Sequence, residues 1–149
     1  MTTLDTVSDH PDPEKHPEFY EGVGIKRLMA WFIDNIIIGL LVAVIGLLTL
    51  TLAFWIWPIA YLVVGFCYRV ITLATGSATW GMRIVGMEFR NRRGDRFNSG
   101  DALVHTLGYT VALTFFITQV VNVILIATTA KGQALHDYIV GSVAINATR

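Results

Sequence analysis

The stretch that decides the fold is residues 25–68, which read IKRLMAWFIDNIIIGLLVAVIGLLTLTLAFWIWPIAYLVVGFCY. From Asn35 to Tyr68 the chain runs 34 residues without a charged side chain. As one helix this run would extend about 51 Å, whereas the hydrocarbon core of a bilayer is about 30 Å thick. The stretch therefore predicts two membrane-spanning helices, joined by a tight turn near residues 48–54.

The composition agrees with a membrane protein. The chain has 149 residues, of which 54% are hydrophobic, and its mean hydropathy is +0.57. These values exceed those of ordinary soluble domains, and the length suits one domain. We expect an all-α membrane protein with about three transmembrane segments, over residues 25–48, 53–73 and 102–128. The domain covers residues 19–149, and residues 1–18, acidic and rich in proline, form a disordered tail.

Two alternatives remain for the third hydrophobic segment, residues 102–130, in which His105 is the only His, Lys, Arg, Asp or Glu. A single crossing would place the C-terminus outside the cell. The short apolar piece at residues 139–145 could instead pair as a strand with residues 84–89, and this pairing requires the third segment to re-enter the membrane. The three-span interpretation is narrowly preferred.

The basic residues predict the orientation. Lys26 and Arg27 precede the first helix, Arg69 and Arg83 follow the uncharged run, and the turn between the helices carries no charge. The positive-inside rule then places the N-terminus and residues 76–101 in the cytoplasm, in a multi-pass protein of the cell inner membrane.

The loop between the second and third segments has a pattern of its own. Residues 84–90 alternate between apolar and polar, and residues 91–95 have turn chemistry, so a short cytoplasmic hairpin is expected. Its arginines are candidates to contact anionic lipid head groups, or they only fix the topology. They are Arg83, Arg90, Arg92, Arg93 and Arg96.

Three short sequence features, taken in their order along the chain, resemble the RDD family of membrane proteins, which is named for an arginine and two aspartates. Arg27 and Asp34 lie seven residues apart at the start of the first helix, and Asp137 follows in Leu-His-Asp. The stretch TWGMR at residues 79–83 is similar to the family's Thr-x-Gly-Lys-Arg loop, with Met82 in place of lysine. The resemblance implies a helical integral membrane protein for which transport, including cation–proton exchange, has been suggested.

Arg27, Asp34, Asp137 and the neighbouring His136 form the candidate site, and two hypotheses explain them. In the structural hypothesis Arg27 neutralises one or both aspartates and fastens the C-terminal segment to the first helix. In the functional hypothesis Asp34, in apolar surroundings, has a pKa suited to binding a proton or a small cation.

No enzyme motif, cofactor fingerprint or metal-ligand spacing is found, so we expect no enzymatic activity, no cofactor and no metal. The expected partners are membrane lipids, a second copy of the chain in a homo-oligomer, and a proton or small cation, but no nucleic acid. The leading functional hypothesis is transport of a proton or small cation. The alternative is a non-transporting membrane scaffold or accessory subunit that binds lipid or another membrane protein.

Overall fold

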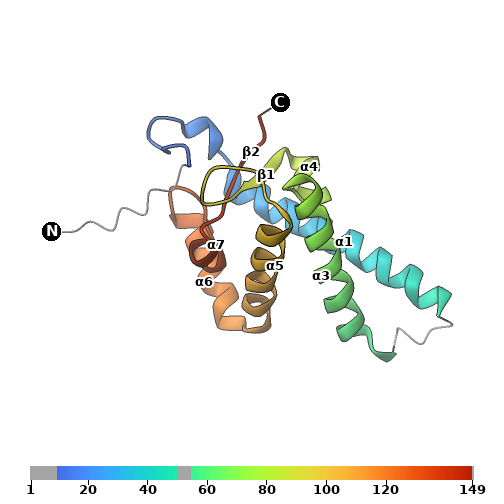
Figure 1. Ribbon diagram of the computed structural model, residues 1–149. Helices are drawn as coiled ribbons and strands as arrows, with labels where there is room; N and C mark the ends of the chain where they lie inside the picture. Colours follow the sequence, from blue (N-terminus) through green and yellow to red (C-terminus); the bar gives the residue numbers. More distant parts are fainter. Residues whose placement is uncertain (1–9, 50–54, 149) are drawn as a thin grey trace.

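The computed structural model describes residues 10–49 and 55–148, and two of its helices are long and apolar enough to span a membrane. They are α1 (Val23–Leu48) and α3 (Trp57–Gly76), which pack against each other as the expected pair (Figure 1). Pro58 lies in the first turn of α3, where its missing N–H costs little. Part of the predicted turn, residues 50–54, lies outside the described residues. The all-α membrane class is confirmed.

The third hydrophobic segment is two helices rather than the single helix predicted for residues 102–128. Between helix α5 (Ser99–Thr114) and helix α6 (Phe116–Thr128) the chain bends by 118°. Phe115 between them has an extended backbone, and the Thr114 hydroxyl donates to the carbonyl of Thr110 at 3.0 Å, a type of bond that often bends helices. The α5–α6 bend lies at the same end of the molecule as the end of α1 and the start of α3, away from the sheet (Figure 1).

A small sheet joins the loop to the C-terminal segment. Strand β1 (Met87–Arg90) pairs antiparallel with β2 (Val143–Asn146), with Met87 opposite Asn146. The turn predicted at residues 91–95 is present and is closed by an isolated antiparallel bridge between Arg90 and Arg96. The strand that pairs with β1, however, comes from the far end of the chain rather than from a local hairpin. Residues 80–85 belong instead to a short helix, α4 (Trp80–Val85). This pairing corresponds to the re-entrant alternative for the third segment.

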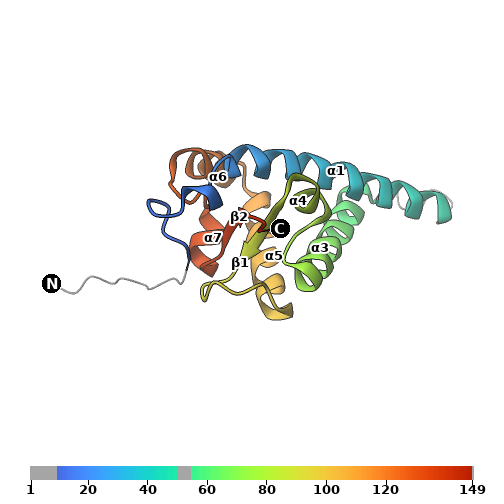
Figure 2. The same ribbon diagram turned by 90° about the horizontal axis from the view of Figure 1, so that it is seen from above.

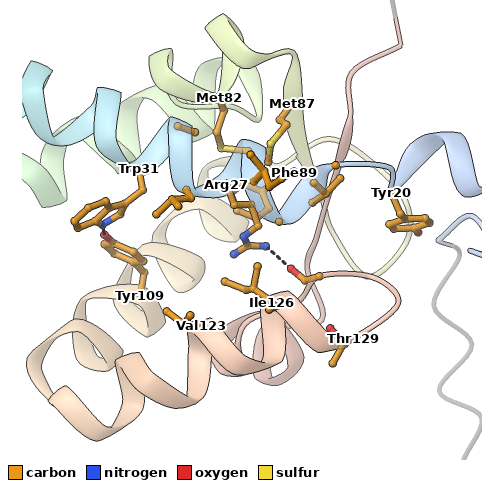
Figure 3. Close-up of a pocket in the computed structure, with 18 of the residues that line it drawn as sticks. Tyr20, Arg27, Trp31, Met82, Met87, Phe89, Tyr109, Val123, Ile126 and Thr129 are labelled. Atoms are coloured by element: carbon orange, nitrogen blue, oxygen red, sulfur yellow. Dashed lines mark hydrogen bonds between the residues drawn. The ribbon is translucent and has the colours of Figure 1, made fainter.

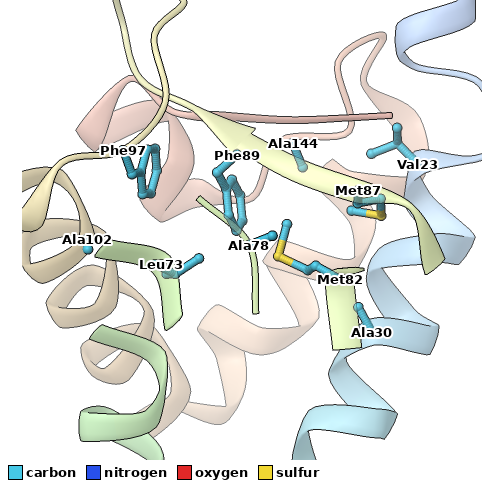
Figure 4. Packing of buried hydrophobic residues seen from close by; sticks show 10 residues of the cluster. All are labelled: Val23, Ala30, Leu73, Ala78, Met82, Met87, Phe89, Phe97, Ala102 and Ala144. Atoms are coloured by element: carbon cyan, nitrogen blue, oxygen red, sulfur yellow. The ribbon is translucent and has the colours of Figure 1, made fainter. Parts of the chain in front are cut away.

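The last helix, α7 (Leu135–Val140), leads into β2 and packs against α5. Seen from above, the sheet lies in the middle, between α7 on one side and α3 with α4 on the other (Figure 2). One buried apolar cluster connects α1, α3, α4, α5 and the sheet (Figure 4). Its members are Val23, Ala30, Leu73, Ala78, Met82, Met87, Phe89, Phe97, Ala102 and Ala144.

The tail that we predicted to be disordered is partly ordered. Residues 1–9 lie outside the described part of the chain. Residues 10–18 contact the domain, and their last two residues begin a short 3-10 helix, η1 (Pro17–Phe19). The Tyr20 hydroxyl donates to the carbonyl of Pro11 at 2.7 Å, and the side chain of Asn146 donates to the carbonyl of Glu18 at 2.8 Å. The prediction of disorder therefore extends too far towards the domain.

The outer sides of α1, α3 and α6 carry large apolar side chains that are exposed in the isolated chain. Examples are Leu40, Leu47, Ile59, Ile71, Ile117 and Ile124. Such surfaces are stable next to lipid tails rather than water, in agreement with a membrane-embedded domain.

Candidate functional site

Asp34 is a buried structural acceptor. Its carboxylate receives hydrogen bonds from the Tyr68 hydroxyl at 2.7 Å, the Thr79 hydroxyl at 2.6 Å and the backbone N–H of Gly81 at 2.8 Å. Both oxygens are used, and the side chain is 2% exposed. Helix α4 is thereby held against α1, while Tyr68 ties in α3. Arg27, the partner considered in the structural hypothesis, does not form an ion pair with Asp34.

Arg27 pairs with the second aspartate instead. Its Nη1 lies 2.7 Å from Oδ2 of Asp137. It also donates to the carbonyl of Gly132 at 3.2 Å (Figure 3). The guanidinium carbon lies 5.4 Å from the centre of the Phe89 ring. Asp137 is fully buried, so this ion pair fastens α7 to α1. The fastening role in the structural hypothesis thus falls to Asp137 rather than Asp34.

The Asp137 carboxylate is saturated with donors. Besides Arg27 it accepts from His105 Nε2 at 2.9 Å, from the Ser142 hydroxyl at 3.0 Å and from the N–H of Ala134 at 2.9 Å. Burial raises the pKa of Asp137, but the charge of Arg27 and the hydrogen bond from His105 outweigh it and hold this pKa below its usual range. Asp137 therefore stays ionised at neutral pH.

His136 lies beside this ion pair without a hydrogen bond of its own. Its Nε2 is 3.6 Å from Oδ1 of Asp137, and neither ring nitrogen has a hydrogen-bond partner among the described residues. Its ring packs edge-on against His105 and Tyr109. Burial lowers the pKa of His136 to about 4, with Asp137 opposing the shift, so the ring is neutral at neutral pH.

The fold brings His105, His136 and Asp137 together in a grouping that the sequence spacing did not predict. Ligand-type atoms of the three lie within 4.8 Å of one another, a geometry that could hold a metal ion. However, the Asp137 carboxylate is already engaged by four donors, and the adjacent Arg27 opposes a cation. The arrangement suits a hydrogen-bonded ion pair better than a metal centre.

A cavity of about 760 Å³ opens beside the ion pair, and we call it the α1–α6 cavity. In Figure 3 the Arg27 side chain extends from α1, which also carries Trp31, towards α6, which carries Val123 and Ile126. Two exposed apolar side chains, Ile25 and Leu28, also line it. The polar side chains that line it are Arg27, Asp34, Arg69, Tyr109, Gln119, His136, Tyr20 and Thr129.

Arg69 is the main residue of this cavity that sequence reasoning missed. We counted it as a topology determinant after the second span, yet it lies within α3, is 9% exposed and faces the cavity. Its guanidinium stacks over the Tyr109 ring at 3.8 Å. The available signal was an arginine inside an apolar helix, directly after the uncharged run, since such residues usually face protein or a cavity.

Three of the five arginines of the predicted lipid site have partners within the described part of the protein. Arg90 and Arg96 both pair with Glu88, which is buried, and Arg83 donates to the carbonyl of Thr72 at 3.4 Å. Arg92 and Arg93 line a smaller cavity that also holds acidic groups. Arg83, Arg90 and Arg96 thus have structural uses, and contact of the five arginines with lipid head groups stays a prediction.

The comparisons with known proteins assign the family. The model of the RDD family matches residues 23–141, which include Arg27, Asp34 and Asp137. No curated protein and no solved structure matches the chain. The chain belongs to the RDD family.

Proposed function

We propose that this RDD family protein is a multi-pass protein of the cell inner membrane that binds a membrane lipid in the α1–α6 cavity, and that its family charges hold the fold. This is the alternative hypothesis of a lipid-binding scaffold or accessory subunit, and no chemical reaction is part of it. The N-terminus and the α4–β1 region are proposed to be cytoplasmic, as the positive-inside rule predicts. Self-association remains a prediction.

The observation that carries the proposal is the cavity itself. Its volume of about 760 Å³ lies within the range of about 300–1,000 Å³ that is usual for ligand pockets. Exposed apolar side chains surround it, among them Ile25, Leu28 and Val123, so a lipid can enter from the bilayer without crossing a polar rim. Polar groups lie deeper, around His136 and Arg69.

The same geometry argues against transport of a small cation at the family aspartates. A cation needs carboxylate oxygens that it can reach, but those of Asp34 and Asp137 are occupied by buried donors. Two arginines, Arg27 and Arg69, also line the cavity and repel a cation.

Lipid retention and ion flux measured on the same preparation test the proposal. We expect the full chain, purified in mild detergent, to retain lipid that mass spectrometry detects, and to give no flux of protons or cations in liposomes with a pH-sensitive dye. Val123→Trp should block the cavity and lower lipid retention. Ile124→Trp is the matched control, because Ile124 is equally part of the exposed side of α6 but does not line the cavity. Equal lipid retention in both variants would refute the proposed function.

Proton transport is the second candidate, and His136 favours it. This histidine lines the cavity, no described residue forms a hydrogen bond to either ring nitrogen, and an ionised carboxylate lies next to it. Its low pKa makes it a poor proton acceptor near neutral pH. Proton flux that is present in the wild type and lost in a folded His136→Gln variant would favour transport over lipid binding.

A further inference from the structure

Arg69 is a buried cation without a counterion. It is 9% exposed, and none of the described carboxylates lies within ion-pair distance of it. Its guanidinium donates no hydrogen bond to a described residue, and the buried Nε is unsatisfied. Stacking on Tyr109 compensates only part of the loss of hydration. An unpaired buried charge of this kind is costly unless a ligand supplies the opposite charge.

Other unsatisfied donors lie around the same cavity. The side-chain Nε2 of Gln119 is buried and meets no acceptor among the described residues. The neutral His136 ring has one N–H and one acceptor nitrogen, and no described residue bonds to either. The acidic oxygens nearby are not available to them, because Asp34 and Asp137 are filled by other donors. The cavity therefore presents one unpaired positive charge, on Arg69, and two N–H donors, on Gln119 and His136, which together suit an anion.

We propose that the α1–α6 cavity binds an acidic lipid headgroup, with Arg69 as the residue that contacts its phosphate or carboxylate oxygens. The inference rests on the proposed function and adds the ligand's charge and the residue that recognises it. Arginine suits this role because its planar donors match two oxygens of a phosphate or carboxylate at once. The apolar chain of the lipid then lies along Leu28 and Val123 and leaves between α1 and α6.

The charge of Arg69 predicts a preference among lipids. In neutral detergent, phosphatidylglycerol should raise the thermal unfolding midpoint of the full chain more than phosphatidylcholine with the same acyl chains, because a ligand that binds only the folded state stabilises it. We expect Arg69→Gln to weaken binding of phosphatidylglycerol about ten-fold or more and to leave phosphatidylcholine unaffected. Arg69→Lys keeps the charge and should retain part of the preference.

The controls separate the charge from a general effect. Lys15→Gln removes an exposed positive charge that neither lines the cavity nor belongs to the predicted lipid contacts, so it should behave like the wild type. Arg69→Gln should still fold, since it removes a buried charge that has no partner. If Arg69→Gln does not fold, Arg69→Lys is compared with the wild type instead. A bidentate contact by Arg69 is contradicted if Arg69→Lys keeps both the affinity for phosphatidylglycerol and the preference for it over phosphatidylcholine.

Two further outcomes would overturn the inference. If inorganic phosphate alone gives the full stabilisation, the ligand is a free anion rather than a lipid. If the wild type retains lipid but does not distinguish the two headgroups, or if Arg69→Gln keeps the preference, Arg69 does not recognise an acid, while lipid binding still stands. Failure of the proposed function gives a different result. In that case the wild type retains no lipid, and Val123→Trp does not change lipid retention.

Discussion

At the scale of single residues, the two aspartates of the family do different work. Asp34 is bound by neutral donors, a tyrosine, a threonine and a backbone N–H, whereas Asp137 is bound by a cation. If asparagine replaces Asp34, its side-chain oxygen can still accept the hydrogen bonds from the Tyr68 hydroxyl and the N–H of Gly81. Loss of Arg27 leaves the second carboxylate buried without its counterion.

We therefore expect Arg27→Ala to destabilise the protein by about 3–5 kcal/mol and to lower its folded yield. Asp34→Asn should cost less, because hydrogen bonding is largely kept. Thermal unfolding in detergent, with folded yield from size-exclusion chromatography, compares the two variants. A stable Arg27→Ala variant would contradict the fastening role of the ion pair.

His136 predicts a pH dependence of stability. Its pKa is about 4 in the folded protein, against 6.5 in the unfolded chain, because burial disfavours the charged ring. The charge of Asp137 opposes this shift of the pKa. The charges of His105, Arg27 and Arg69 add to it. Between these values the unfolded chain binds more protons, so stability is full above about pH 6.5 and decreases as the pH falls towards about 4, by up to about 3 kcal/mol.

Unfolding midpoints measured at about pH 7 and about pH 5 should show this loss. His136→Gln cannot titrate, so its midpoint should change less over the same interval. The pKa of Asp137 lies below its usual range, and the stability that it contributes is lost only at more acidic pH. An equal pH dependence in the wild type and in His136→Gln would show that His136 is not the group responsible.

At the scale of elements, α4 packs very closely on α1. A Cβ atom at Gly81 would overlap the carbonyl oxygen of Ala30 and lie 2.7 Å from Oδ1 of Asp34. Only glycine allows this approach, which also lets the N–H of Gly81 reach the carboxylate. The contact of the two helices and the hydrogen bonds of Asp34 therefore depend on one another.

Gly81→Ala should destabilise the protein by about 1–3 kcal/mol, the usual cost of overpacking a tight contact. Gly39→Ala is the control, because a Cβ atom there meets nothing within 4 Å and alanine favours the helix. Thermal unfolding of both variants in the same detergent measures the difference. Equal midpoints would mean that α4 can move away from α1 at little cost.

At the scale of the whole molecule, the sheet fixes which parts of the chain share a side of the membrane. β1 comes from the loop after the second span and β2 from the C-terminal segment, and they are paired along four residues each. Paired strands cannot lie on opposite sides of a bilayer. The bent α5–α6 pair must then enter and leave from the same side.

Cysteine labelling in a Cys67→Ser background tests this topology. Arg93→Cys and Ala147→Cys should both react from the cytoplasmic side and be protected from impermeant reagents added to the periplasm. Labelling of position 147 alone from the periplasm would mean that the third segment crosses once. Labelling of both from the periplasm would reverse the orientation but keep the re-entrant topology.

The sequence by itself determined the membrane class, the two long helices and the candidate charges, because hydrophobicity and charge are summed over neighbouring residues. It also pointed to Arg27, Asp34 and Asp137 through their order along the chain. Only the tertiary structure decided which charges pair, since Arg27 and Asp137 lie far apart in sequence and Asp34 could have served either role. The bend at Phe115 and the pairing of β1 with β2 likewise depend on contacts between distant segments. The sequence could not predict that Arg69 lines a cavity for the same reason. Helical periodicity predicts on which face of a helix a residue lies, but not which other element packs against that face.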